Sequence, residues 1–254
     1  MKINHVKRAL AAGQIQLGTH AAYLQSPDVA RILGAAGFHW AFLDAEHGPF
    51  DVSMTRDLCR AAVAANLSPV VRVADLQYSL VARALDAGAE GIMFPRVESP
   101  ELLAAAVQWT KFPPLGVRGY GLTPHWVDYE KVSIPQIIEH VNANTMVVLQ
   151  IETQRAVDAC GELLSVPGID TVMVGPADLS ISLGVPGDFL NPKMVAAMEK
   201  VRDICIAHKV TPGTQTRSLD LAKFWRERGM RFLGCGSDTG MLYERACEIV
   251  KGLS

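Results

Sequence analysis

The sequence lacks a surplus of charge of either sign. Its 254 residues include 24 Lys and Arg and 26 Asp and Glu, so the net charge is −2. Nucleic acids and anionic membranes are bound by concentrated positive charge, so neither partner is expected. No stretch approaches the roughly 20 apolar residues that span a bilayer, and the N-terminal stretch MKINHVKRALAAGQIQ lacks the apolar segment of a signal peptide. These absences predict a cytoplasmic, soluble protein.

Cysteine is scarce and irregularly placed. The cysteines are odd in number, form no C-x-x-C pair and lie among apolar neighbours; they are Cys59, Cys160, Cys205, Cys235 and Cys247. Disulfides belong to oxidising compartments, and structural zinc sites need closely spaced ligands. Free, buried thiols in a reducing compartment are therefore expected.

Strand and helix patterns alternate along the whole chain. Eight short and continuously apolar runs are typical of strands buried on both faces of a parallel sheet. The runs are Ile15–Thr19, Trp40–Asp44, Pro69–Val73, Gly91–Phe94, Met146–Ile151, Thr171–Val174, Thr211–Gln215 and Phe232–Gly236. Helix signals lie between them, with Ser-Pro openings at Ser26 and Ser99 and glycines at several helix ends.

Eight strand–helix units in about 250 residues predict a (β/α)8 TIM barrel, formed as a single domain over residues 1–254. A doubly wound parallel sheet remains the alternative, because the number of strands does not prove that the sheet closes. The longest interval, residues 95–145, is expected to hold two helices around a loop rich in glycine, proline and aromatic residues.

The residues that follow the strands are polar, and in a barrel they meet at the end where active sites lie. They are His20, Asp44, Glu46, His47, Arg72, Arg96, Gln150, Glu152, Asp178, Gln215, Arg217 and Asp238. Glu152 and Asp178 follow adjacent strands and would repel each other unless positive charge lies between them. A hard divalent cation fits this need, Arg72 could supply the charge instead, and each carboxylate alone could cap a helix.

Three further residues allow two interpretations each. His47 could act as a base, or it could be a structural histidine bonded to Asp44 or Glu46. Arg72 ends a buried run and must meet either a protein carboxylate or a substrate oxygen. Asp86 lies in a helical pattern, which alone favours a solvent-exposed helix face.

Lysine is absent from the positions where carbonyl chemistry would use it. None of the lysines lies within a predicted strand or directly after one. A Schiff-base mechanism needs a partly desolvated lysine in the pocket, so carbonyl chemistry is expected to use a metal ion. The sequence also lacks a P-loop and a G-x-G-x-x-G motif. The segment GCGSDTG could hold a phosphate at a helix N-terminus, although Asp238 would repel the anion.

Six segments resemble the HpcH/HpaI family of metal-dependent (class II) pyruvate aldolases, in the same order from about Gly18 to the C-terminal helix. They are LDAEHGPF, PVVRV, ALDAGAEGIMFPRVES, FPPLGVRGYG, VVLQIET and GIDTVMVGPADLSISLG. The family includes 4-hydroxy-2-oxoheptanedioate and 2-dehydro-3-deoxyglucarate aldolases. The resemblance implies reversible cleavage of 4-hydroxy-2-oxo acids to pyruvate and a small aldehyde. It also implies a homo-oligomer, a hexamer whose C-terminal helices are exchanged between neighbours.

The resemblance assigns a role to each matching residue. Glu152 and Asp178 would hold a divalent ion, namely Mg²⁺, Mn²⁺ or Co²⁺. His47 would transfer protons with Asp86 as its partner, which replaces the interpretation of Asp86 as a solvent-exposed residue.

The same resemblance implies how pyruvate is bound. Arg72 and Gln150 would contact the enolate and carbonyl oxygens. The backbone at the start of the helix after the sixth strand would receive the carboxylate, through Gly175, Pro176, Ala177 and Asp178.

Three segments differ from the family pattern: GLTPHWVDYEKV, PGTQTR and the position of Phe50. They are expected to line the pocket for the aldehyde. Gln215 and Arg217 favour a polar or carboxylated aldehyde, with Gln215 in contact with the substrate.

Two other functions remain open. A CoA-ester lyase of the citrate-lyase β-subunit type would use the same metal carboxylates, but it would need a basic pocket for the adenine phosphates, and no basic cluster is evident. A non-catalytic barrel that binds a keto acid would bind metal without turnover.

Overall fold

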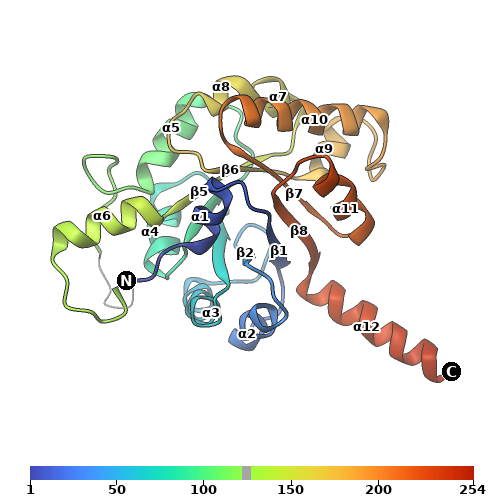
Figure 1. Cartoon of the computed structure of the whole chain (residues 1–254), viewed down its shortest axis with the longest axis horizontal. Coiled ribbons are helices and arrows are strands. Elements are labelled where there is room, and N and C mark those ends of the chain that lie inside the picture. The colour runs from blue at the N-terminus through green and yellow to red at the C-terminus, as the bar shows by residue number, and fades with distance from the viewer. Residues whose placement is uncertain (122–126) are drawn as a thin grey trace.

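Eight parallel strands close into a barrel, which confirms the predicted TIM barrel and excludes the open sheet (Figure 1). The computed structural model describes residues 1–121 and 127–254. The strands are β1 (Gln16–Ala21), β2 (Trp40–Asp44), β3 (Ser68–Arg72), β4 (Gly91–Phe94), β5 (Met146–Ile151), β6 (Thr171–Val174), β7 (Thr211–Thr216) and β8 (Phe232–Ser237). Four strands have the predicted bounds, and the others differ by one or two residues at an end.

Helices cover the outside of the barrel. In the described residues they are α1 (His5–Ala11), α2 (Pro27–Ala35), α3 (Val52–Ala64), α4 (Tyr78–Asp86), α5 (Pro100–Trp109), α6 (Ile134–Asn144), α7 (Gln154–Asp158), α8 (Cys160–Leu164), α9 (Pro176–Ser182), α10 (Pro192–Ala207), α11 (Leu219–Glu227) and α12 (Asp238–Leu253). Ser26 and Ser99 cap α2 and α5, each followed by proline, as predicted. The interval between β4 and β5 contains the two expected helices, α5 and α6.

The barrel interior near the beginnings of the strands is filled with apolar side chains. Its members are Val6, Leu10, Trp40, Phe42, Val70, Met93, Met146, Val148, Met173 and Phe232. Trp40 and Phe232 stack with ring centroids 3.9 Å apart. Val6 and Leu10 belong to α1, so this helix closes the end of the barrel where the strands begin. We call that end the base and the opposite end the mouth.

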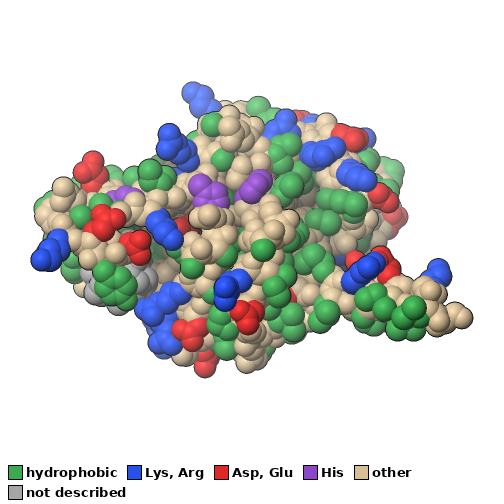
Figure 2. Space-filling view, turned by 60° about the horizontal axis from the view of Figure 1, so that its bottom comes forward, with side chains coloured by type: hydrophobic (Ala, Val, Ile, Leu, Met, Phe, Trp, Pro, Cys, Tyr) green, Lys and Arg blue, Asp and Glu red, His purple; other side chains and the backbone are tan. Residues whose placement is uncertain are grey.

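The C-terminal helix α12 projects away from the barrel (Figures 1 and 2). Its exposed apolar side chains are Leu242, Tyr243, Ile249, Val250 and Leu253. In α12 only Asp238 is buried. The five cysteines are free, and Cys59, Cys160 and Cys205 are buried as expected. The prediction of burial was wrong for Cys247, because it lies on this projecting helix.

None of the helices in the described ranges has the length and apolar character needed to cross a membrane.

Candidate active site

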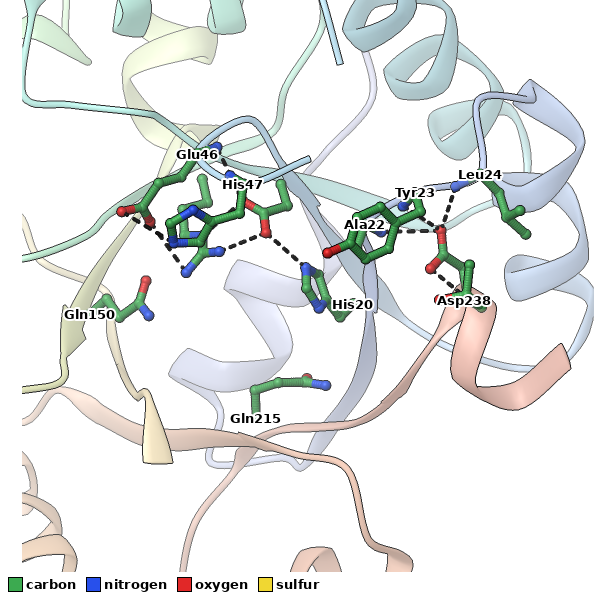
Figure 3. Close-up of polar contacts among 12 residues, drawn as sticks. His20, Ala22, Tyr23, Leu24, Glu46, His47, Gln150, Gln215 and Asp238 are labelled. Carbon is green, nitrogen blue, oxygen red and sulfur yellow. Dashed lines mark hydrogen bonds and ion pairs between the residues drawn. The ribbon is translucent and has the colours of Figure 1, made fainter. Parts of the chain in front are cut away.

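Polar side chains from separate strands converge at the mouth. Alternate residues of a strand face the same side, so the face that carries apolar residues near the base carries polar residues near the mouth. On β2, for example, Phe42 lies below Asp44. Figure 3 shows His20, Gln150 and Gln215 around one opening, with Glu46 and His47 at its edge.

Asp44 is the most heavily bonded side chain of the mouth. Its carboxylate accepts Arg72 Nε at 3.0 Å and Nη2 at 2.6 Å, and His20 Nε2 lies 3.0 Å from Oδ2. The backbone N–H groups of Glu46 and His47 donate to Oδ1 at 3.1 Å each. Burial would raise the pKa of Asp44, but the hydrogen bonds from His20 and Arg72 and the Arg72 charge hold it well below the usual range. Asp44 is therefore a fixed anion that orients its neighbours.

Arg72 is held between two carboxylates. Besides Asp44, its Nη1 lies 3.3 Å from Glu46 Oε2. Glu46 Oε1 in turn lies 3.2 Å from Arg96 Nε. Of the two partners considered for Arg72, the structure has the protein carboxylate. A guanidinium has five N–H donors, and these contacts use three, so two remain for a substrate.

Glu152 and Gln150 form a buried pair at the end of β5. Gln150 Nε2 donates to Glu152 Oε2 at 2.7 Å, and the backbone N–H of Arg96 donates to Oε1 at 2.8 Å. Arg96 has φ of 54°, a left-handed conformation that is uncommon outside glycine and that points this N–H at the carboxylate. Burial, together with the charges of Asp178 and Glu46, raises the pKa of Glu152 to about 7. The carboxylate is thus short of compensating positive charge.

Asp178 lies in the first turn of α9, close enough for its charge to act on Glu152. Gly175 precedes this helix, and a Cβ there would lie 2.9 Å from Gln150 Nε2 and 3.2 Å from Glu152 Oε2. Glycine is therefore needed for the backbone to approach this pair. No side chain caps α9. The Gly175 N–H donates to Ile151 O at 2.9 Å and Pro176 has no N–H, so the backbone donors left at this helix start are those of Ala177 and Asp178.

This donor set fits a divalent cation. The described residues contain no group of three or more His, Cys, Asp or Glu side chains able to hold a metal. Two carboxylates with open coordination positions nevertheless suit a hard ion that also binds substrate and water. Gln150 Oε1 is buried without a hydrogen-bond partner in the described chain, which provides a further oxygen at the same place.

His47 lies at the edge of the mouth. Its Nε2 is 3.7 Å from Glu46 Oε1, and its side chain is 57% exposed. The ring is therefore accessible to a substrate or a water molecule, and its position is compatible with proton transfer.

Asp86 does not reach His47 within one chain, so their expected pairing stays a prediction that would need a second copy of the chain. Its Oδ1 accepts Arg118 Nη2 at 2.7 Å. A helix that follows a strand runs back towards the base, and Asp86 is the last residue of α4. His47 follows β2 at the mouth, so the two side chains lie at opposite ends of the barrel.

Two segments expected at the aldehyde pocket lie elsewhere. Phe50 packs into the apolar layer between barrel and helices. Residues 122–126 of GLTPHWVDYEKV lie outside the described residues, but Asp128 and Tyr129 line a cavity of about 290 Å³ with Glu90 and Thr145. Glu90 directly precedes β4 and Thr145 directly precedes β5, so this cavity lies at the base. The helix α5 runs from the mouth back to the base, which is why the segment that follows it lies there.

Gln215 faces the mouth as predicted, and its Nε2 donates to Gly236 O at 2.7 Å. Arg217 is exposed beyond the end of β7. The helix end considered for a phosphate is capped by Ser237, whose Oγ accepts the Gly240 N–H at 3.2 Å. Asp238 Oδ2 accepts the backbone N–H groups of Ala22, Tyr23 and Leu24 at 3.1, 3.0 and 2.9 Å, which joins α12 to the loop after β1 (Figure 3).

The buried lysine of the chain lies at the base. Lys111 Nζ donates to Asn142 O at 2.9 Å and Thr145 O at 2.8 Å, just before β5 begins. Burial, with the nearby charge of Lys7, lowers the pKa of Lys111 to about 7. Lys111 therefore lies away from the mouth of its own chain, and the absence of a Schiff-base lysine stays a prediction.

Asp44, Glu46 and His20 were expected at the mouth because they follow strands, but no role was predicted for them beyond a possible bond to His47. The pairing of Asp44 with Arg72 could have been inferred, because the two residues end β2 and β3 in register. The partners of Glu46 and His20 could not, since they depend on side-chain geometry at the mouth.

Known proteins of the same kind match nearly the whole chain. The family model described as HpcH/HpaI aldolase/citrate lyase matches residues 22–244. A 5-keto-4-deoxy-D-glucarate aldolase of Salmonella paratyphi A is 34% identical over 237 residues, covering 93% of this chain and 91% of that protein.

Two solved structures are also similar. The HpcH/HpaI aldolase from Desulfitobacterium hafniense DCB-2 has a TM-score of 0.92 and 32% identity, covering 97% of this chain and 95% of that one. An HpcH/HpaI aldolase/citrate lyase family protein from Burkholderia cenocepacia J2315 has a TM-score of 0.91 and 33% identity, covering 98% and 99%. The chain therefore belongs to the HpcH/HpaI aldolase/citrate lyase family, a family of carbon–carbon lyases.

Proposed function

We propose that this chain is a divalent-metal-dependent aldolase that reversibly cleaves 4-hydroxy-2-oxo acids to pyruvate and an aldehyde. The observation that carries the proposal is Glu152: a buried carboxylate directly after β5, with a raised pKa and a second carboxylate near it. Glu152 and Asp178 would hold Mg²⁺, Mn²⁺ or Co²⁺. When bound, such an ion supplies Lewis-acid stabilisation of a developing enolate oxygen.

The residues of the chain would bind and orient the substrate around this position. The two free N–H groups of Arg72 and the amide of Gln150 lie where they could contact the keto oxygen. The backbone of Gly175–Asp178 would receive the pyruvate carboxylate through the N–H groups of Ala177 and Asp178, because Pro176 has none and that of Gly175 is bonded to Ile151 O. In the cleavage direction a ring nitrogen of His47 would accept the proton of the C4 hydroxyl, and it would return that proton to the pyruvate methyl carbon.

Asp86 would assist His47 only from a second copy of the chain, because the two residues lie at opposite ends of one barrel. The exposed apolar side chains of α12 favour assembly, since such a surface is normally covered in solution. We therefore retain the homo-oligomer, with a hexamer as its size, and a cytoplasmic location as parts of the proposal.

The two alternative functions have weaker support. Arg72 and Arg96 at the mouth are both paired with Glu46, which leaves them poorly suited to the phosphates of CoA. A barrel that only binds a keto acid would not need an accessible histidine beside the paired carboxylates.

Pyruvate release tests the proposal directly. The protein should be incubated with 4-hydroxy-2-oxo acids, beginning with 5-keto-4-deoxy-D-glucarate because the relatives are named for it. We expect pyruvate in the presence of Mg²⁺, Mn²⁺ or Co²⁺ and little in excess EDTA. No pyruvate with any of the three ions, or a covalent adduct trapped by borohydride, would exclude this mechanism.

A further inference from the structure

His20 has two ring nitrogens in different surroundings. The imidazole stacks on Phe42 with centroids 4.0 Å apart and an interplanar angle of 14°. Its Nε2 is anchored 3.0 Å from Asp44 Oδ2. Its Nδ1 makes no hydrogen bond within the described residues, and the side chain is 22% exposed. The ring is therefore fixed on two sides and leaves one polar atom at the mouth.

Asp44 does not need His20 for its own stability. Arg72 donates two hydrogen bonds to the carboxylate, and two backbone N–H groups add two more. A carboxylate has about four acceptor positions, so these donors already satisfy it. An apolar ring at position 20 would stack on Phe42 equally well. Neither packing on Phe42 nor hydrogen bonding to Asp44 therefore explains why the ring at position 20 carries a free Nδ1.

The strand next to His20 carries glycines near the mouth, and a polar side chain lies across them. β8 lies between β1 and β7, and it carries Gly234 and Gly236 near the mouth. The Gln215 side chain lies across Gly234, where a Cβ would come within 1.6 Å of Oε1. This Oε1 is buried without a hydrogen-bond partner in the described part of the chain. His20 Nδ1 is therefore the accessible unused polar atom at this side of the mouth, and Gln215 lies across the glycines of β8 from it (Figure 3).

His20 lies away from the strands that carry Glu152 and Asp178. The proposed metal ligands belong to β5 and the start of α9, whereas His20 belongs to β1 and is separated from Arg72 by Asp44. A substrate held at Glu152 would extend its aldehyde half towards other parts of the mouth.

We propose that His20 is a specificity residue for the aldehyde, in which Asp44 and Phe42 hold the ring so that Nδ1 hydrogen-bonds a hydroxyl next to the carbonyl carbon. The proposal rests on the aldolase function proposed above and assigns the polar aldehyde to a particular atom. With Nε2–H donating to Asp44, Nδ1 is the atom left to accept a hydrogen bond from the hydroxyl. An aldehyde without that hydroxyl leaves Nδ1 unsatisfied on binding.

The test compares two acceptors of similar size. Pyruvate is added to glycolaldehyde, which carries the hydroxyl, and to propanal, which carries a methyl group in its place. The ratio of the two kcat/KM values measures recognition of the hydroxyl. Exchange of the pyruvate methyl protons in D₂O, followed by NMR, measures enolate formation without any acceptor.

Two variants separate the two nitrogens. His20→Gln can keep an amide N–H near Asp44 but has no atom at the Nδ1 position. His20→Asn can keep a polar atom near Nδ1 but loses the reach to Asp44. We expect the glycolaldehyde preference to fall about ten-fold in His20→Gln, as for loss of one hydrogen bond, and to fall less in His20→Asn. Lys111→Met at the base should keep the wild-type ratio.

Other outcomes would overturn the assignment. An unchanged ratio in His20→Gln would show that Nδ1 does not read the acceptor. Equal slowing of exchange and of both additions would show that His20 only positions Arg72 through Asp44. If one variant does not fold, the kcat/KM ratio of the other still decides. An unchanged glycolaldehyde preference in His20→Gln contradicts the proposal, and so does complete loss of that preference in His20→Asn. A wild-type protein without exchange or cleavage would instead refute the aldolase function itself.

Discussion

The two ends of β5 both bury an ionisable side chain, but they treat its charge differently. At the base, Lys111 donates to two backbone carbonyls, and burial lowers its pKa to about 7. At the mouth, Glu152 receives two hydrogen bonds, yet its pKa is raised to about 7 and a second carboxylate lies nearby. The base is complete within the chain, whereas the mouth still needs positive charge.

The difference shows what distinguishes a site from a structural buried charge. Burial and a shifted pKa occur at both ends, so neither property identifies function alone. At the mouth they coincide with unused polar atoms, among them Gln150 Oε1 and Gln215 Oε1. A ligand can compensate the charge and bond the unused polar atoms, so the two features together indicate a binding site.

Removal of the Glu152 charge should have the largest effect. Glu152→Gln keeps the size of the side chain but loses the anion, so we expect pyruvate release to fall by about 10³-fold or more. The matched control is Glu90→Gln, a carboxylate near the base that accepts Ser68 Oγ at 2.7 Å. Its activity should remain within about two-fold of wild type. Similar losses in both variants would show that the two ends do not differ in function.

Asp44→Asn should have the next largest effect. The variant keeps the shape of the side chain but loses the charge that holds Arg72 and fixes the His47 backbone, so we expect kcat/KM to fall about 100-fold. Steady-state kinetics over a range of substrate concentrations would measure the loss. A change below about three-fold would mean that Arg72 is oriented without Asp44.

The metal-free protein should lose stability as the pH rises through the range of Glu152. Its folded-state pKa of about 7 lies above the usual 4.5, so the folded protein binds more protons between these values. The stabilising contribution is complete below pH 4.5 and is lost by pH 7, with an upper limit of about 3 kcal/mol. Urea unfolding in EDTA at several pH values should show this slope, and Glu152→Gln should reduce it. An identical slope in the variant would contradict the assignment.

Lys111 should produce the smallest effect on activity and the opposite pH slope. Its folded-state pKa of about 7 lies below the usual 10.5, so its contribution is present above pH 10.5 and is lost as the pH falls through 7. Lys111→Met should remove this part of the pH dependence of unfolding and leave pyruvate release within about two-fold of wild type. A large loss of activity would mean that Lys111 takes part in catalysis, although it lies away from the mouth.

Sequence patterns predicted much of this arrangement for physical reasons. Strands buried on both faces must be continuously apolar, so their polar ends, such as Gln150 and Glu152, were visible. Side-chain contacts between helices and strands could not be predicted from the sequence pattern, because they depend on the direction in which each element runs as well as on the order of the elements. The position of Asp86 relative to His47 is an example, since α4 returns to the base and places Asp86 far from the His47 of its own chain. The polar edge of His20 depends on the stacking partner Phe42, which sequence spacing does not reveal.

Cation binding tests most directly the claim that the mouth lacks positive charge. Isothermal titration of the EDTA-treated protein with Mn²⁺ should give one site per chain in the wild type. Glu152→Gln and Asp178→Asn should each weaken that site by about 100-fold or more, because each removes a charged oxygen ligand. Glu90→Gln should bind as the wild type does. Equal Mn²⁺ affinity in the wild type and in Glu152→Gln would contradict the account.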